Sequence, residues 1–291
     1  MSIFGSRKGL KILFVGTEVS PFAKVGGLSS VAHSLPNALN KLGHDARVMI
    51  PRYLFIEDQK YNLEMEYQNL NVPTGVLEGE DGQKTLVCNV KKFTPVDDTD
   101  SNNFITYFLE NMEYYEQRAN VYGYADDPIR WALLCRGALE FIKQSNDWVP
   151  DIIVGLDWQA GLIPNYIKTI YAKDPVIGGI STVFSIHNLF FQGMFDHHFV
   201  SEMDFDDGHS AIPSFFNPRL FKLNLMRRGI MYADVVNTVS PSYAKEIMTK
   251  EYGELLDELL RERRAVLTGI LNGIDYDVWD PENDPHISFK Y

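Results

Sequence analysis

The sequence predicts an α/β fold with a Rossmann-like, mostly parallel sheet and helices on both faces. Short apolar runs such as Lys11–Gly16, Asp151–Gly155 and Thr182–Ile186 alternate with amphipathic stretches. Strands of a parallel sheet are buried on both faces and therefore read as continuous apolar runs. The chain has 291 residues, 45% of them hydrophobic, which is enough to bury a sizeable core.

The first helix is predicted directly after the first strand and its polar loop. Apolar residues recur at helical spacing over residues 28–42. Ser29 or Ser30 is the expected N-cap, and Gly43 is the expected stop. Pro36 lies inside this stretch and is expected to kink or split the helix, because proline lacks a backbone N–H.

The remaining elements are predicted from the same two patterns, continuous apolar runs for strands and apolar residues at helical spacing for helices. We predict helices at Ile129–Lys143 and Gly161–Tyr171, and a helix after Ser240 with Ser240 as its cap and Pro241 in its first turn. Residues 192–222 read as a long loop rich in aromatic residues, Asp and His. Strands or final apolar runs are predicted at Ala46–Ile50, Thr85–Val90, Phe104–Leu109, Val235–Val239 and Ala265–Leu271.

The charge balance excludes some partners. The formal net charge is −12, from 39 acidic and 27 basic residues, so we expect no binding to nucleic acid or to anionic membranes. No apolar stretch approaches the ~18 residues of a membrane span, and the run Ile12–Val15 is too short for a signal peptide. Cys88 and Cys135 are interpreted as reduced thiols, which predicts a cytoplasmic protein.

Polar residues or glycines follow five separate apolar runs. In an open parallel sheet, ligands bind beyond the carboxyl ends of the strands. Any one polar residue in a loop is weak evidence, but the repetition indicates a site at this edge. In chain order these residues are Lys24, Gly26, Gly27, Asp157, Trp158, His187, Asn188, Ser240, Asn272 and Gly273.

The segment Lys24–Gly27 has the chemistry of a phosphate site. Two glycines allow backbone N–H groups to approach a phosphate, and Lys24 and the start of the next helix supply positive charge. The alternative is a flexible loop before a helix. The segment matches neither G-x-G-x-x-G nor a P-loop.

Residue type alone does not decide the role of three other groups. His187 has three possible roles: a proton donor, a hydrogen-bond partner for a sugar hydroxyl, or a structural histidine with its hydrogen bonds satisfied at a strand end. Asp157 has two: it orients a sugar or caps the next helix. A third group invites a metal interpretation, but its spacing fits no zinc or EF-hand pattern, so we expect a solvated loop and no metal. Its members are Asp196, His197, His198, Asp204, Asp206, Asp207 and His209.

Six segments together resemble one family. They occur in the family's order over residues 11–281, and they resemble the starch and glycogen synthases, glycosyltransferase family 5. The segments are KILFVGTEVSPFAKVGGLSSVAHSLPNAL, YGYADDPIRWALLC, DWQAGL, HNLFFQG, YADVVNTVSPSYAKEI and ILNGIDYDVWDP.

The resemblance implies the N-terminal half of a GT-B fold, in which two Rossmann-like domains face each other across a cleft. It implies a retaining transfer of glucose from ADP-glucose or UDP-glucose to an α-1,4-glucan, with no cofactor and no required metal. His187 and Asp157 are the catalytic candidates. The substrate-binding candidates that it implies are Lys24, Gly26, Gly27, Tyr115, Asn188 and Asn272.

The chain also departs from the family pattern. Ser29 and Ser30 replace a small residue and an aspartate, Gln159 replaces a histidine, and Phe190 and Phe191 replace a smaller residue and a tyrosine. We expect residues 1–9 to be an extension, 10–279 the catalytic domain, and 280–291 a truncated linker toward an absent C-terminal domain. That domain, on a separate chain, is then an expected partner.

Two rival functions remain. The first is a non-catalytic module that binds glucan or nucleotide sugar, or serves as a subunit of a split synthase; the departures and the expected missing half favour it. The second is an unrelated nucleotide-binding oxidoreductase, against which the missing G-x-G-x-x-G pattern argues.

Overall fold

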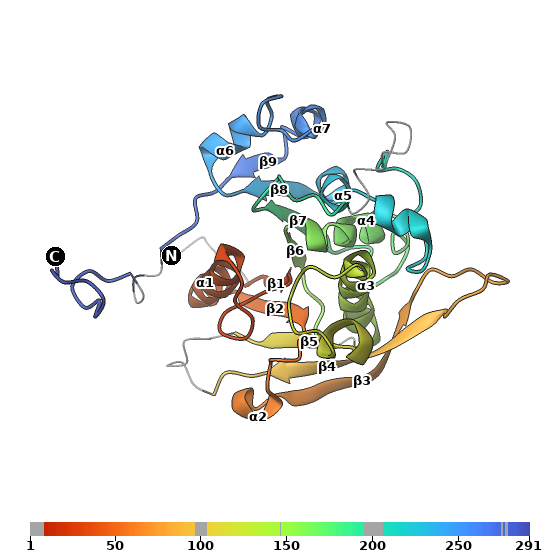
Figure 1. Ribbon diagram of the computed structural model, residues 1–291, viewed down its shortest axis with the longest axis horizontal. Coiled ribbons are helices and arrows are strands. Elements are labelled where there is room, and N and C mark those ends of the chain that lie inside the picture. Colours follow the sequence, from red (N-terminus) through yellow and green to blue (C-terminus); the bar gives the residue numbers. More distant parts are fainter. Residues whose placement is uncertain (1–8, 97–103, 146, 195–205, 275, 277–278) are drawn as a thin grey trace, which may run out of the picture.

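A single nine-stranded sheet, in the order β3-β4-β5-β2-β1-β6-β7-β8-β9, organises the molecule (Figure 1). The computed structural model describes residues 9–96, 104–145, 147–194, 206–274, 276 and 279–291. The strands are β1 (Lys11–Val15), β2 (Asp45–Pro51), β3 (Glu64–Pro73), β4 (Thr85–Phe93), β5 (Thr106–Glu110), β6 (Ile152–Leu156), β7 (Ser181–Ile186), β8 (Val235–Thr238) and β9 (Leu267–Gly269).

The sheet is mostly parallel, as predicted. Every neighbouring pair from β5 through β2, β1, β6, β7 and β8 to β9 is parallel. The β3–β4 and β4–β5 pairs are antiparallel and form one margin of the sheet. The sequence did not predict β3, because this edge strand is largely exposed and its register shifts around Asn69, which has a φ of 56°.

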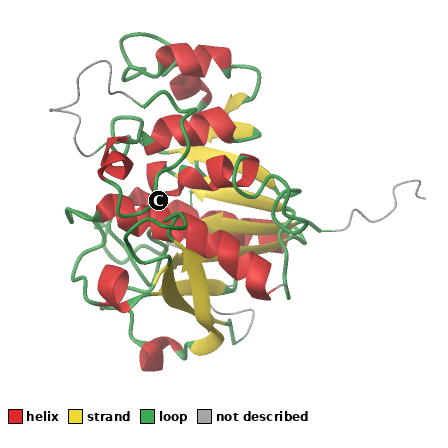
Figure 2. Ribbon diagram, turned by 90° about the vertical axis from the view of Figure 1, so that its right-hand side faces the viewer, coloured by secondary structure: helices red, strands yellow, loops and turns green. Residues whose placement is uncertain are grey.

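Helices cover both faces of the sheet, as predicted (Figure 2). Alternate side chains of a strand point to opposite faces. Leu13 and Val15 accordingly join the core under α3 and α4, whereas Ile12 and Phe14 join the core under α1. The helices are α1 (Gly27–Lys41), α2 (Asp58–Tyr61), α3 (Asp127–Ser145), α4 (Leu162–Lys168), α5 (Leu225–Tyr232), α6 (Pro241–Glu246) and α7 (Asp257–Glu262).

Helix α1 differs from its prediction in two respects. It runs from Gly27 to Lys41 with Pro36 inside it, so the predicted split into two helices is wrong. Pro36 is buried, and this apolar contact offsets part of the cost of the missing N–H. The N-cap is Gly26, while Ser29 lies in the first turn and donates from Oγ to the Gly26 carbonyl at 2.7 Å.

Two predicted helix boundaries are confirmed. Gly43 has a φ of +88° and its N–H donates to the Asn40 carbonyl at 2.9 Å, which ends α1. Ser240 caps α6, since its Oγ accepts from the Tyr243 N–H at 2.9 Å, and Pro241 occupies the first turn.

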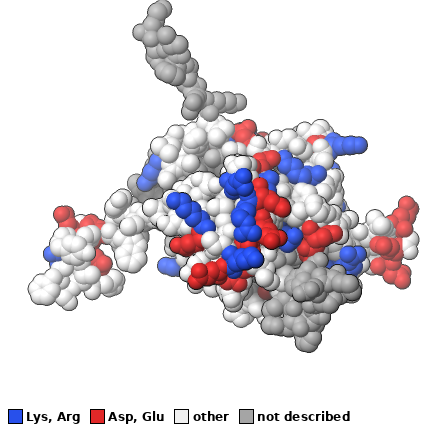
Figure 3. Space-filling view, turned by 90° about the horizontal axis from the view of Figure 1, so that it is seen from above, with Lys and Arg blue, Asp and Glu red and all other residues white. Residues whose placement is uncertain are grey.

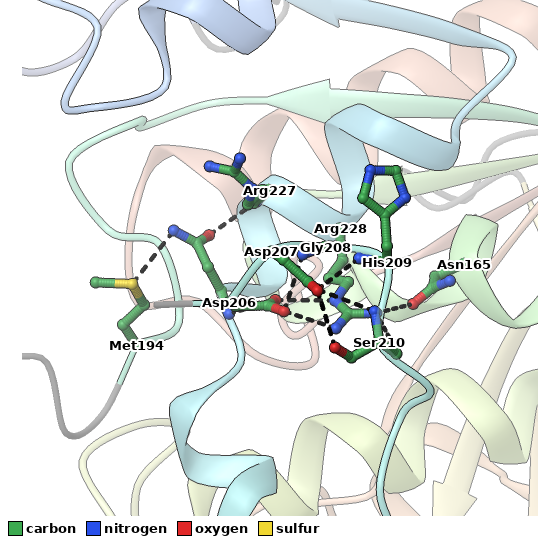
Figure 4. A network of polar contacts seen from close by, with 10 residues as sticks. Asn165, Met194, Asp206, Asp207, Gly208, His209, Ser210, Arg227 and Arg228 are labelled. Atoms are coloured by element: carbon green, nitrogen blue, oxygen red, sulfur yellow. Dashed lines mark hydrogen bonds and ion pairs between the residues drawn. The ribbon is translucent and has the colours of Figure 1, made fainter. Parts of the chain in front are cut away.

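A buried ion pair ties the described end of the connection between β7 and α5, from residue 206 onward, to α5 itself (Figure 4). Arg228 of α5 is fully buried and donates to both oxygens of Asp206, from Nη2 at 2.6 Å and from Nε at 2.8 Å. Its Nη1 donates to the Ser210 carbonyl at 2.6 Å and to Asn165 Oδ1 at 3.2 Å. The expectation of a solvated loop is therefore wrong for Asp206.

The neighbouring Asp207 does fit that expectation. It is exposed, and its Oδ1 accepts from the N–H groups of His209 and Ser210 in a tight turn. The predicted loop residues Asp196, His197, His198 and Asp204 lie outside the described residues. Within the described part of the chain, no group of three His, Cys, Asp or Glu residues could hold a metal ion.

The surface that α6 and α7 form at the top of Figure 1 carries interleaved positive and negative side chains (Figure 3). Arg261 on α7, for example, pairs with Asp257 at 2.6 Å. Among the helices that the structure describes, none is long and apolar enough to cross a membrane. Cys88 and Cys135 are buried and unpaired, as predicted.

The Arg228–Asp206 pair yields a stability prediction. Arg228→Met leaves the Asp206 carboxylate buried without its partner, which should lower the free energy of unfolding by about 3–5 kcal/mol. Arg261→Met is the control, because the Arg261 side chain is 41% exposed and should contribute under about 1 kcal/mol. Urea unfolding of both variants measures this, and equal losses would contradict the buried-pair account.

Candidate active site

The carboxyl ends of the parallel strands meet at one edge of the sheet. Register sets this edge, because neighbouring strands end on paired residues or one residue apart, and each loop then leaves from nearly the same level. The predicted site residues other than Tyr115 lie in these loops or, for Gly27, at the first residue of α1. The last residues of β1, β6, β7 and β8 pair with residues at or next to the end of the following strand: Val15 with Gly155, Leu156 with Ser185, Ile186 with Thr238, and Thr238 with Gly269.

The loop between β1 and α1 is organised by Glu18, which the sequence analysis missed. Glu18 is buried, and its Oε2 accepts from the N–H groups of Val25 at 2.9 Å and Gly26 at 2.8 Å. The Gly26 amide is therefore occupied, which corrects the expectation that both glycine amides face a phosphate. Lys24 is exposed at the tip of this loop.

Gly27 is the first residue of α1, and the space beside its Cα is unfilled. Among the described residues, a Cβ built on Gly27 would meet nothing within 4 Å, and no side chain caps α1. The N-terminus of a helix carries partial positive charge and free N–H groups, which suit a phosphate. A phosphate at this loop, as the sequence predicts, would therefore meet the amides from Gly27 onward rather than that of Gly26.

Tyr122 supports Glu18 from a second loop. Its hydroxyl donates to Glu18 Oε1 at 2.9 Å and lies 2.6 Å from Thr17 Oγ1. Because a carboxylate only accepts, the Thr17 hydroxyl is the donor in the second bond. Burial and the nearby Glu18 charge raise the Tyr122 pKa, so the phenol remains a donor at neutral pH.

Asp157 directly follows β6 and is buried with a φ of 60°. Burial raises the pKa of its carboxyl to about 7; the amides of Trp158, His187 and Asn188 oppose this shift and the Glu18 charge adds to it. Within the described residues its Oδ1 has no hydrogen-bond partner. The side chain makes no capping bond to the following short helix, so the capping alternative is wrong.

His187 and Asn188 follow β7 beside Asp157. The His187 ring is half-buried, its Nε2 lies 3.0 Å from Ser185 Oγ, and burial lowers its pKa to about 4. The imidazole is therefore neutral at pH 7. Asn188 is exposed, and its Oδ1 accepts from the Phe190 N–H at 3.1 Å.

Phe190 and Phe191, two of the family departures, also lie at this edge. Their exposed fractions are 68% and 56%, and their rings meet edge to face at 5.3 Å. Two exposed aromatic rings beside the site offer apolar area to a sugar or to another protein surface. Asn272 follows β9 and is exposed.

Tyr115 does not lie at this edge. It is fully buried in the core, and its hydroxyl donates to the Arg130 carbonyl at 2.7 Å. A side chain without exposed surface contacts no ligand in this conformation, which corrects the prediction for Tyr115. The tyrosine that reaches the edge is Tyr122. Tyr115 and Tyr122 lie in the same aromatic segment, and their positions in the sequence alone could not show which of them reaches the edge.

The fold is a Rossmann-like domain in which polar side chains and the uncapped start of a helix share one edge of the sheet. Residues 11–262 match the family model described as the starch synthase catalytic domain, and the chain belongs to this family. The resemblance seen in the sequence is thereby confirmed.

Curated relatives agree with this assignment. The glycogen synthases of Geotalea uraniireducens (strain Rf4) and Thermotoga maritima are 38% identical over 287 and 284 residues, and that of Clostridium botulinum (strain Eklund 17B / Type B) is 40% identical over 286. Each match covers 97% of this chain and 56% of the relative. The chain thus spans about half the length of these relatives.

A solved structure supports the fold. The catalytic domain of Starch Synthase IV from Arabidopsis thaliana, bound to ADP and acarbose, superposes with a TM-score of 0.76 at 26% identity. The match covers 97% of this chain and 55% of that chain. The predicted half of a GT-B catalytic domain is confirmed.

The raised pKa of Asp157 makes stability depend on pH. The native state keeps a proton that the unfolded chain releases above pH ~4, so stability is lost as the pH rises toward 7. Between pH 5 and pH 8 the wild type should lose about 2–3 kcal/mol relative to Asp157→Asn.

Urea unfolding at both pH values tests this expectation. Asp207→Asn is the control, because backbone N–H groups lower the Asp207 pKa to about 2, so it titrates below this window. A stability difference between the wild type and Asp157→Asn that is the same at pH 5 and pH 8 would show that Asp157 does not hold this proton.

Proposed function

We propose that this chain is the donor-side half of a retaining α-1,4-glucosyltransferase of the starch and glycogen synthase type. Its substrates would be ADP-glucose or UDP-glucose and the non-reducing end of an α-glucan. One observation carries the proposal: Lys24, the open start of α1, Asp157 and His187 meet at one edge of a sheet in a member of this family. The ADP and acarbose bound to the Arabidopsis relative support both substrate classes.

The residues suit departure of a nucleoside diphosphate. As the glycosidic bond to the diphosphate breaks, negative charge builds on the leaving group and positive charge on the sugar. Lys24 and the amides at the start of α1 would stabilise the diphosphate. The acceptor 4-hydroxyl then attacks on the same face of the sugar: the new C1–O4 bond replaces the bond from C1 to the diphosphate, whose departing oxygen takes the hydroxyl proton, and the configuration is retained.

His187 and Asp157 would act on the sugar. A neutral imidazole both donates and accepts, which suits a glucose hydroxyl. Asp157 has a buried oxygen without a partner, and its raised pKa allows it to be protonated or ionised near neutral pH. Asn188 and Asn272 would line the same site, and we assign a general base to no residue.

Within this proposal, Lys24 is the one cationic side chain that the described candidate site brings to the leaving diphosphate, and charge stabilisation of the leaving group calls for more positive charge. We propose that a second GT-B domain supplies it, either from further residues of the same polypeptide or from a separate chain. The cytoplasmic location and the domain limits at residues 10 and 279 stay predictions.

The second candidate function is a non-catalytic module that binds nucleotide sugar or glucan. The exposed Phe190 and Phe191 favour it, because apolar rings occupy a place where polar groups were expected. Glucose transfer from ADP-glucose and UDP-glucose onto glycogen separates the two functions. The assay uses this chain alone and together with a candidate second domain; transfer in neither case, with ADP still bound, would favour the module.

Gly27 gives a specific test of donor binding. Gly27→Ala should fold normally, because its Cβ meets nothing within 4 Å and alanine favours helices. It should nevertheless weaken ADP binding by roughly tenfold, since the methyl group would lie where the phosphate approaches the amides.

Calorimetric titration with ADP and urea unfolding measure the two effects. Gly179→Ala is the matched control: its Cβ also meets nothing within 4 Å, and it precedes β7 at the opposite edge of the sheet. Equal ADP affinity in wild type and both variants would contradict a phosphate site at α1.

A further inference from the structure

Glu18 is a buried carboxylate whose partners are all neutral. Only 3% of its surface is exposed. Its hydrogen bonds come from two backbone amides and one phenol, and within the described residues it forms no ion pair. An unpaired buried charge is costly, and three donors to its two oxygens reduce that cost. The backbone amides of the loop therefore stabilise the Glu18 carboxylate, and the same hydrogen bonds fix the conformation of the loop.

The two amides belong to the residues between Lys24 and α1. Val25 and Gly26 both donate to the same oxygen, Glu18 Oε2, which fixes the direction of the chain at this point. The loop then enters α1 at Gly27 with no side-chain cap. The Glu18 carboxylate therefore fixes the backbone between Lys24 and the first amides of α1.

The glycines themselves do not set this conformation. Gly26 has an extended backbone, with φ at −140°, and a Cβ on it would lie 4.0 Å from Glu18 Oε1. Any residue adopts such a φ. The loop shape at this point therefore comes from hydrogen bonds, those of Val25 and Gly26 to Glu18 and that of Ser29 Oγ to the Gly26 carbonyl. The absence of a side chain at Gly26 and Gly27 leaves the backbone accessible to a ligand.

We propose that Glu18 is the positioning residue of the donor site: it holds Val25 and Gly26 so that Lys24 and the first amides of α1 face the diphosphate. Tyr122 fixes the Glu18 carboxylate in turn. The inference rests on the proposed function, since it assigns how that site is built. It also states which amides serve the ligand, namely those from Gly27 onward.

Glu18 has a second effect, on Asp157. Groups that face the Asp157 carboxyl from neighbouring segments are Glu18, Tyr122 and Tyr243, together with the amides that follow β6 and β7. The Glu18 charge favours the protonated form of Asp157. Loss of this charge should lower the Asp157 pKa, which reports that the Glu18 carboxylate is ionised next to Asp157.

Glu18→Gln and Tyr122→Phe test the proposal in the full chain, with the exposed Glu78→Gln as the charge-matched control. Amide hydrogen exchange at Val25 and Gly26 should be at least tenfold faster in Glu18→Gln, and somewhat faster in Tyr122→Phe. ADP affinity should fall by roughly tenfold in Glu18→Gln and less in Tyr122→Phe. The Asp157 carboxyl, followed by NMR, should titrate at lower pH in Glu18→Gln, and Glu78→Gln should match the wild type throughout.

The outcomes separate the inference from the proposed function. If the wild type binds ADP while both variants keep its affinity and amide protection, the role of Glu18 is overturned. If the wild type does not bind ADP, the proposed function fails and the donor role with it, while faster exchange in Glu18→Gln would still confirm that Glu18 holds the loop. Should Glu18→Gln fail to fold, Tyr122→Phe alone decides, because it removes one hydroxyl from an otherwise unchanged ring.

Discussion

The parallel register of the sheet is the constraint on which the site depends. Because β1, β6, β7 and β8 end within one residue of each other in the register, four loops that are distant in sequence leave the sheet at nearly the same level. Asp157 turns away from β6 with a φ of 60°, which places its carboxyl against the amides that follow β7. A change of register in any of these strands would separate the lysine loop from the imidazole.

An unusual balance of charge follows from this arrangement. A site proposed for an anionic diphosphate contains two buried carboxyls, Glu18 and Asp157. Their environments give them different roles: Glu18 is surrounded by donors that belong to the protein, whereas Asp157 keeps an oxygen without a partner and a pKa near neutral. The first carboxyl shapes the site, and the second is left for the ligand.

The sequence predicted most of the sheet, because buried parallel strands are continuous apolar runs that need no tertiary information. It also placed Lys24, Asp157, His187 and Asn188 correctly at the strand ends, since topology decides that placement. The sequence did not predict which side chains pair with one another. The bonds between Glu18 and the glycine loop and between Asp206 and Arg228 join residues whose proximity only the folded chain reveals. Tyr115 and Tyr122 look alike in sequence, and burial alone distinguishes them.

The central claim is that the lysine loop, Asp157 and His187 form one ligand site. Backbone amide NMR during a titration of the chain with ADP tests it most directly. The account predicts that the largest shifts fall together on Lys24, Gly27 and Leu28 and on the amides that follow β6 and β7, with one common affinity. Shifts confined to another surface, or separate affinities for the two groups of amides, would contradict it.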